Sequence, residues 1–218
     1  MATRRKSGTT DRRNREPEIV DAAVRVFHDK GYLAASLQDV ADIVGVLKGS
    51  LYHYIDSKED LLYRICAHSH ERASEIMRAA VEASDDPLEQ LRTYLTDIGA
   101  WYLHNIERVS IYFNEGRWLT GERLEKVRDE RREFQGFLRG LIEKAAQQGE
   151  IAPHVEPRLA THLILGSLNN VSTWYRPDGL YAPTEIVEAF TQMALASLTG
   201  ESPSPRTKQP ARGRARAK

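Results

Sequence analysis

The stretch that decides the fold runs from Ser36 to Lys58 and reads SLQDVADIVGVLKGSLYHYIDSK. Ser36 is a helix N-cap residue, and the apolar residues after it recur at helical spacing as far as Gly45, which ends a short helix. A second helix is expected to start directly after this turn and to last about two turns, to Ile55. Two short helices joined by a tight glycine turn predict a helix-turn-helix.

The second helix of such a unit enters the major groove of DNA, where each base pair presents a distinct pattern of donors and acceptors. Lys48 can reach guanine or a phosphate, and Gly49 lets the backbone approach DNA closely. Lys58 lies in the first turn of the next helix, where free N–H groups and the helix dipole favour a phosphate. The candidate DNA-contacting residues are therefore Ser36, Lys48, Gly49, Ser50, Tyr52, His53 and Lys58.

The rest of the chain also reads as helix. Nearly all of it between Pro17 and Gly200 has helical periodicity, and no segment alternates apolar and polar residues long enough to propose a strand. One helix precedes the motif, from near Pro17 to Gly31, and further helices are expected at 57–83, 86–104, 109–119, 122–148, 156–175 and 184–198. This predicts an all-α protein of about nine helices, with a basic arm (1–15), a helix-turn-helix domain (16–58), a helical C-terminal domain (59–200) and a basic tail (201–218).

Length and composition exclude several classes of protein. With 218 residues, 41% of them hydrophobic and 28% charged, the chain is typical of a soluble globular protein. Cys66 is its single cysteine, so no intramolecular disulfide can form and a reducing cytoplasm is the expected location. The longest stretch without Asp, Glu, Lys or Arg, residues 159–175, contains His162 and two asparagines, which argues against a membrane span. The N-terminus has no apolar run of the kind found in a signal peptide.

The formal net charge of zero conceals an uneven distribution. Residues 1–15 and residues 201–218 each hold six Arg or Lys against one acidic residue, and the part between them is acidic. Basic ends on an acidic body suggest contact with a polyanion, and nucleic acid fits better than a membrane surface because no basic amphipathic helix accompanies them. Solvated tails without a partner remain the alternative.

The sequence contains no recognisable catalytic or metal-binding motif. His68 and His70 are two apart, whereas metal-binding pairs on a helix stand three or four apart. Cys66 lies on the packing seam of a long helix, which indicates a structural thiol. The residues of this seam are Leu62, Cys66, Ser69, Ala73, Ile76 and Ala80. The sequence contains no glycine-rich phosphate loop and no nucleophile elbow. We therefore expect no catalytic residue, no metal site and no cofactor, and a helical enzyme or carrier stays only as a third alternative.

The same stretch carries a resemblance to a known family. The residues Gly31-Tyr32, the run from Ser36 to Ala41 and the run from Gly45 to Leu62 resemble the N-terminal domain of TetR-family transcriptional regulators over about 45 residues without a gap. The resemblance implies a homodimeric repressor that reads an inverted repeat in double-stranded DNA, while residues 59–200 dimerise and bind a small-molecule effector. Two positions depart from the family pattern: Leu47 stands where Ser or Thr is frequent, and Ile55 where Phe is usual.

A candidate effector site is suggested by aromatic residues on the middle helices. A pocket for a small molecule is largely apolar with a few polar groups, and the candidate ligand-binding residues are Trp101, Tyr112, Arg117, Trp118, Asn169 and Trp174. Aromatic residues at helical spacing also form ordinary cores, so packing is the alternative for each of them.

A second resemblance concerns the effector. The pattern Tyr112-x-x-Glu115, Arg131, Gly149-x-Ile151 and the run from Trp174 to Gly179 is similar to TetR regulators of fatty-acid and sterol-side-chain breakdown that sense acyl-CoA thioesters. It implies a CoA thioester as effector. Where sterol-CoA sensors carry an Arg and a Trp, this chain has Leu165 and Asn169, so a different acyl group or a different ligand is also open.

The last two helices are expected to form the dimer interface. Gly166, Ser167, Ala194 and Ser197 are small enough to let helices approach closely, which suits a four-helix interface made by two copies.

The sequence leaves two main classes of function open. The first is a ligand-responsive repressor, and the second is a constitutive or architectural DNA-binding protein without an effector.

Overall fold

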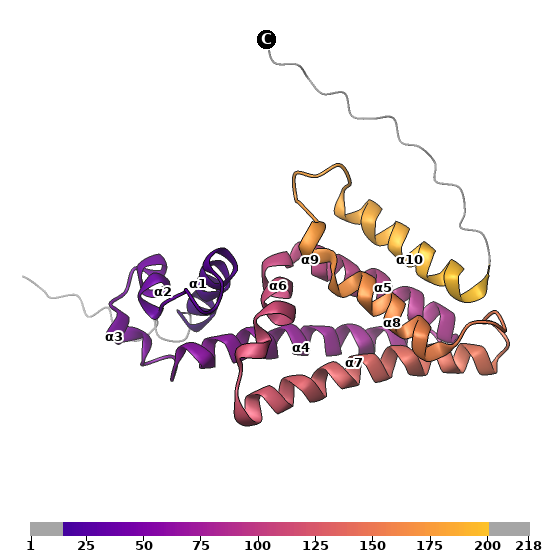
Figure 1. The fold of residues 1–218 in the computed structure, drawn as a ribbon, viewed down its shortest axis with the longest axis horizontal. Helices are drawn as coiled ribbons and strands as arrows, with labels where there is room; N and C mark the ends of the chain where they lie inside the picture. The colour runs from indigo at the N-terminus through magenta and orange to yellow at the C-terminus, as the bar shows by residue number, and fades with distance from the viewer. Residues whose placement is uncertain (1–14, 201–218) are drawn as a thin grey trace, which may run out of the picture.

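The computed structural model describes residues 15–200, and this part of the chain contains helices and no strand. The prediction of an all-α fold is confirmed. Figure 1 shows the helix-turn-helix at one end, with α4 extending from it along the body. The elements are α1 (Arg15–Lys30), α2 (Leu37–Val44), α3 (Lys48–Leu51), α4 (Lys58–Ala83), α5 (Pro87–His104), α6 (Ile106–Asn114), the 3-10 turn η1 (Gly116–Trp118), α7 (Gly121–Gln147), α8 (Pro157–Asn169), α9 (Val171–Trp174) and α10 (Pro183–Thr199). The basic tail, and all of the basic arm except Arg15, lie outside the described residues.

The helix-turn-helix is set by local hydrogen bonds at its two ends. The Ser36 hydroxyl accepts from the backbone N–H of Asp39, and the Asp39 carboxylate accepts from the backbone N–H of Ser36, which makes a reciprocal capping box. Gly45 closes α2 with φ of 71°, a left-handed conformation that glycine adopts without a steric penalty. Both predicted ends of α2 are confirmed.

The recognition helix α3 is shorter than the sequence indicates. It ends at Leu51, and the chain continues as a turn to Tyr54 instead of a second helical turn. Two hydrogen bonds in this turn join residues three apart, as in a 3-10 helix. They run from the N–H of His53 to the carbonyl of Ser50 and from the N–H of Tyr54 to the carbonyl of Leu51. Leu47 offers no side-chain cap at the start, so little in the sequence favours a longer helix.

The body is built on the long helix α4, which packs against α5 and α7 along its length and against α1 and α6 near its start. The predicted seam of α4 is buried at every position: Leu62, Cys66, Ser69, Ala73, Ile76 and Ala80. The buried core of the helix-turn-helix does not stop at Lys58, because Ile111, Leu119 and Val127 belong to the same cluster. We call helices α1 to α3 the reading head. The reading head and α6 therefore share one core.

The C-terminal half departs from the sequence in two places. The helix expected at 109–119 begins earlier, at Ile106, and ends at Asn114, and the 3-10 turn η1 follows it. The helix expected at 156–175 is divided into α8 and α9 at Asn170, whose backbone carbonyl accepts a hydrogen bond from the Thr173 hydroxyl at 2.8 Å. The Thr173 hydroxyl thus competes with backbone N–H groups for the Asn170 carbonyl, which would otherwise accept a helical hydrogen bond. Among residues 15–200, no helix combines the length and apolar character that crossing a membrane requires.

Candidate nucleic-acid interface and effector cavity

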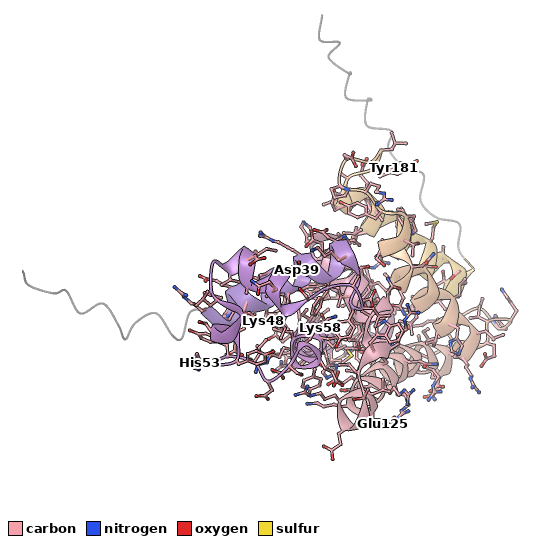
Figure 2. The ribbon with its side chains drawn as sticks, turned by 60° about the vertical axis from the view of Figure 1, so that its left-hand side comes forward. Asp39, Lys48, His53, Lys58, Glu125 and Tyr181 are labelled. Atoms are coloured by element: carbon pink, nitrogen blue, oxygen red, sulfur yellow. The ribbon has the colours of Figure 1, made fainter. Side chains whose placement is uncertain are left out.

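The recognition segment presents polar side chains outward and anchors itself with apolar ones. Lys48, Tyr52 and His53 are exposed, while Leu51 and Ile55 between and after them are buried in the core with α1 and α2. Figure 2 shows Lys48, His53 and Lys58 on the helix-turn-helix, apart from Glu125 and Tyr181. The alternation gives a surface that can meet DNA without losing its packing.

Two further predicted residues flank this segment and are already engaged. The Ser36 hydroxyl is used in the capping box and also donates to the Asp39 carboxylate at 2.7 Å. The Lys58 ammonium lies 4.4 Å from the centre of the Tyr32 ring and donates to the Leu33 carbonyl at 3.3 Å, and partial burial lowers the pKa of Lys58. Its position at the start of α4 is the one expected for a phosphate contact.

Asp39 is held ionised beside this surface. Lys30 forms an ion pair with it at 2.6 Å. The hydrogen bonds from Lys30 and Ser36 lower the pKa of Asp39 to about 2.

Gly49 is exposed, and a side chain placed there would meet open space within the protein, so the fold itself does not require glycine at this position.

A network of charges ties the reading head to the body. The buried carboxylate of Asp60 accepts from Arg64 at 2.9 Å and from Arg123 of α7 at 3.0 Å. Arg64 also pairs with Glu16 of α1. A second link runs from α6 to α1, because Arg108 pairs with Asp21. Helices α1, α4, α6 and α7 are thus joined by charge as well as by the shared core.

Two of the predicted ligand-binding residues meet at a small cavity inside the body. Trp101 of α5 and Tyr112 of α6 both line it, and its free volume is about 10 Å³. The other lining residues were not predicted from the sequence, although Ser69 and Ala73 fall on the predicted seam of α4. The complete lining is Ser69, Ala73, Trp101, Tyr102, Val109, Tyr112, Phe113 and Phe134, five of which are aromatic.

The other four candidates lie elsewhere. Arg117 and Trp118 are exposed on η1, with the guanidinium 5.3 Å from the indole ring. Trp174 of α9 borders an open hollow beside α10, and its ring lies 5.7 Å from that of Phe190. Asn169 is the last residue of α8 and lines neither space. The six residues therefore do not line one pocket.

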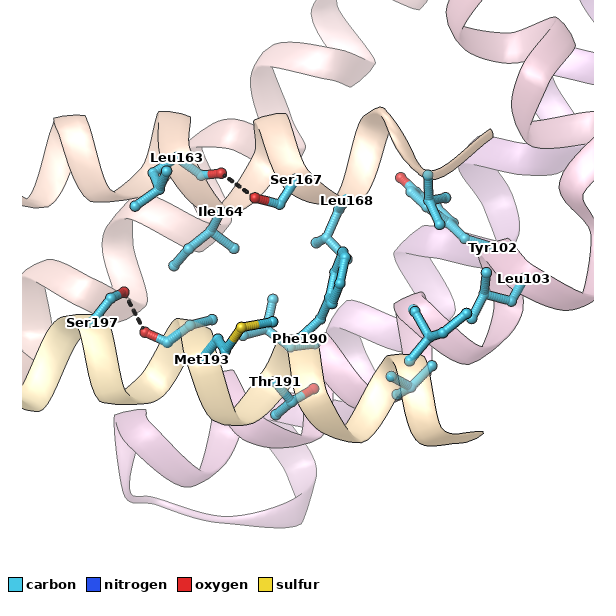
Figure 3. A pocket seen from close by; sticks show the side chains of 16 residues that line it. Tyr102, Leu103, Leu163, Ile164, Ser167, Leu168, Phe190, Thr191, Met193 and Ser197 are labelled. Carbon is cyan, nitrogen blue, oxygen red and sulfur yellow. Dashed lines mark hydrogen bonds between the residues drawn. The ribbon is translucent and has the colours of Figure 1, made fainter. Parts of the chain in front are cut away.

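A larger apolar groove of about 240 Å³ lies between α8 and α10, over α5. Figure 3 shows residues of α8 and α10 facing each other across it. Its two serine hydroxyls are used internally, since Ser167 donates to the carbonyl of Leu163 and Ser197 to that of Ala194. Leu163 and Met193 are 62% and 53% exposed at its mouth. The groove thus offers shape and apolar surface but few free polar groups.

The environment of the single cysteine makes its thiol unreactive. Cys66 is fully buried, and burial raises the pKa of its thiol to about 12, so the thiolate is disfavoured. In the described part of the chain, no three residues of the His, Cys, Asp and Glu types stand close enough to hold a metal ion.

An exposed recognition segment on a capped helix-turn-helix, fixed to an all-helical body, defines the class of helix-turn-helix DNA-binding proteins. Residues 19–65 match the family described as bacterial regulatory proteins, tetR family, and residues 84–198 match the tetracyclin repressor-like C-terminal domain. The chain belongs to the TetR family of transcriptional regulators, which are not enzymes.

Relatives agree over most of the chain. It is 26% identical to the HTH-type transcriptional repressor KstR2 of Rhodococcus jostii (strain RHA1), covering 87% of this chain and 94% of that protein. It is 27% identical to the fatty acid metabolism regulator protein of Bacillus subtilis (strain 168), covering 83% and 94%. The crystal structure of AibR in complex with isovaleryl coenzyme A and operator DNA is similar, with a TM-score of 0.76, 28% identity and coverage of 83% and 97%.

Proposed function

We propose that this chain is a ligand-responsive repressor that binds an inverted-repeat operator as a homodimer and is released by an acyl-CoA thioester. The observation that carries the proposal is the position of α6, which lies between the aromatic cavity and the reading head. Support for the effector class comes from AibR, which was solved with isovaleryl coenzyme A and operator DNA. A regulator of genomic DNA acts in the cytoplasm, and a free, buried Cys66 is compatible with that reducing compartment.

The DNA contacts follow from the exposed segment. Lys48 reaches a guanine edge or a phosphate, and Ser50 is short enough to adapt to either. Tyr52 and His53 donate to phosphate oxygens, and Lys58 adds its charge at the start of α4. Dimerisation uses the groove between α8 and α10, because a second copy would cover the apolar side chains exposed there.

The effector acts through the cavity that Trp101 and Tyr112 line. Because the free volume is only about 10 Å³, an acyl group has to displace side chains to enter. Val109, Tyr112 and Phe113 of α6 line the cavity, while Ile111 on the same helix lies in the core of the reading head. A shift of α6 therefore moves α1 and changes the separation of the two heads, which must fit successive major grooves about 34–36 Å apart. The ligand must bind the two states with different affinity.

The test is affinity selection of fragments from the source genome with the purified full-length protein, followed by elution with acyl-CoA thioesters and the matching free acids. Recovery of an inverted repeat that one thioester releases is the expected result. Recovery without release by any compound would refute the effector part and favour the constitutive DNA-binding protein. Recovery of no specific fragment would refute the repressor reading as a whole.

A further inference from the structure

Polar atoms without partners gather in one part of the otherwise apolar body. Among residues 15–200, five buried side-chain nitrogen or oxygen atoms lack a hydrogen bond, and four of these belong to His70, Tyr112, Glu130 and Arg131. These residues are neighbours, since Tyr112 interacts electrostatically with Arg131 and Glu130, and Glu130 with His70. We call these four residues the polar cluster. Buried polar groups without partners are costly, so their concentration calls for a ligand.

Arg131 is the charged member of the polar cluster. Its guanidinium lies 4.9 Å from the centre of the Tyr112 ring, and one of its Nη atoms donates to the Tyr112 carbonyl. Its Nε has no hydrogen-bond partner, and in the described part of the chain it forms no ion pair with a carboxylate. Burial raises the pKa of the neighbouring Glu130, while the charges of His70 and Lys126 act in the opposite direction. Arg131 therefore keeps a hydrogen-bond donor that no group in the described part of the chain uses.

The polar cluster borders the aromatic cavity. Tyr112 lines the cavity and is 5% exposed, with its hydroxyl unpartnered. His70 packs its ring 5.1 Å from that of Phe134, another lining residue. Arg131 does not line the cavity itself, but its guanidinium lies 4.9 Å and 6.0 Å from the ring centres of Tyr112 and Phe113, which do. A group that enters the cavity meets Tyr112 directly and would reach Arg131 by displacing these rings.

Trp101 is shared by this cavity and a hollow on the surface. It lines the cavity and also an open hollow between α4 and α5 that Arg72 and His104 border. Its ring rests edge-on against Tyr102 at 5.8 Å. Displacement of this one side chain would join the two spaces, so a ligand can insert one end while its larger part stays in the open hollow.

We propose that the buried end of the effector carries a carboxylate, which Arg131 and Tyr112 bind after the acyl chain has displaced Trp101. The inference rests on the proposed function and narrows the effector to thioesters of dicarboxylic acids. A plain alkyl end would bury the same polar atoms and leave them unpaired, whereas a carboxylate accepts from a guanidinium in a paired geometry. When Arg131 turns to the carboxylate it gives up its bond to the Tyr112 carbonyl, and α6 loses a tether to α7.

The test compares thioesters of equal chain length in direct titrations of the full-length protein. The pairs are succinyl-CoA with butyryl-CoA, glutaryl-CoA with valeryl-CoA, and adipoyl-CoA with hexanoyl-CoA. For at least one pair we expect the carboxylated member to bind about tenfold more tightly or better, as a hydrogen bond to a charged group predicts. In a Trp118→Phe, Trp174→Phe background, Trp101 is the remaining tryptophan, and its fluorescence should change on binding.

Variants locate the preference. Arg131→Gln should abolish it, and Tyr112→Phe, which removes one hydroxyl and keeps the ring, should reduce it even if the arginine variant fails to fold. Arg128→Gln is the matched control, because Arg128 lies on the same helix, is exposed and pairs with Glu125. Equal affinities within all three pairs would overturn the inference while leaving thioester sensing intact. A preference that survives in Tyr112→Phe and in folded Arg131→Gln would also overturn it, and no thioester binding at all would overturn both proposals.

Discussion

Replacing Asp60 with alanine should destabilise the protein more than any exposed charge change on α7. The carboxylate of Asp60 is 6% exposed and accepts from Arg64, from Arg123 and from the backbone N–H of Asp56. Removing one partner of a buried ion pair costs about 3–5 kcal/mol, because the other charge is left unpaired. Here Arg64 and Arg123 are 29% and 33% exposed, so water recovers part of the loss. We therefore expect about 2–3 kcal/mol.

Thermal unfolding followed by circular dichroism measures this loss. For a protein of this size, 1 kcal/mol lowers the Tm by roughly 2–4 °C, so Asp60→Ala should lower it by about 4–12 °C. Protein concentration must be equal for all variants, since dimer stability depends on it. Glu125→Ala is the control: Glu125 pairs with Arg128 at 2.6 Å, but both side chains are more than half exposed. That change should cost less than about 0.5 kcal/mol, and equal shifts for the two variants would refute the reasoning.

Three further predictions concern DNA binding, pH and assembly. Lys48→Ala or Tyr52→Ala should weaken operator binding by about 1–3 kcal/mol in fluorescence anisotropy, and wild-type affinity in either would contradict the docking. Folding lowers the pKa of Asp39 to about 2, so its contribution is complete above its ordinary pKa and disappears as the pH falls through about 2. The difference in unfolding free energy between wild type and Asp39→Asn, from urea melts, should therefore shrink with acidification, and a constant difference would count against it. Leu163→Glu should yield monomers in light scattering, while Leu180→Glu, changed at an 86% exposed loop position, should leave the dimer intact.

The helix ends were predictable because they depend on local hydrogen bonds. Ser57 accepts from the backbone N–H of Asp60, as the spacing of the two residues indicates. Asp86 accepts from the N–H of Leu88, and Pro87 takes the first position of α5 as expected. Each of these contacts spans two or three residues, so the sequence alone contains all the atoms involved. The shortness of α3 and the break at Asn170 were missed, because periodicity continues through both.

The effector residues were harder to predict because helical spacing places a side chain on a face without saying what packs against that face. Trp101 and Trp118 have the same residue type and lie in the same region of the sequence, yet Trp101 borders the cavity and Trp118 is exposed on η1. The difference comes from the packing of α6 and η1 against α4. Only the assembled fold decides between these positions.

Arg131 illustrates how the two kinds of information combine. It lies on the apolar side of α7, where it interrupts a stripe that contains Val127 and Phe134. The structure supplies the reason: the guanidinium bonds to the carbonyl of Tyr112, nineteen residues earlier, and stacks on its ring. The same helix that carries this carbonyl also carries Arg108, which pairs with Asp21 of the reading head. A charge that interrupts a helix core is therefore bonded to α6, the helix that is itself paired with α1, and this is the path along which we propose that an effector changes DNA binding.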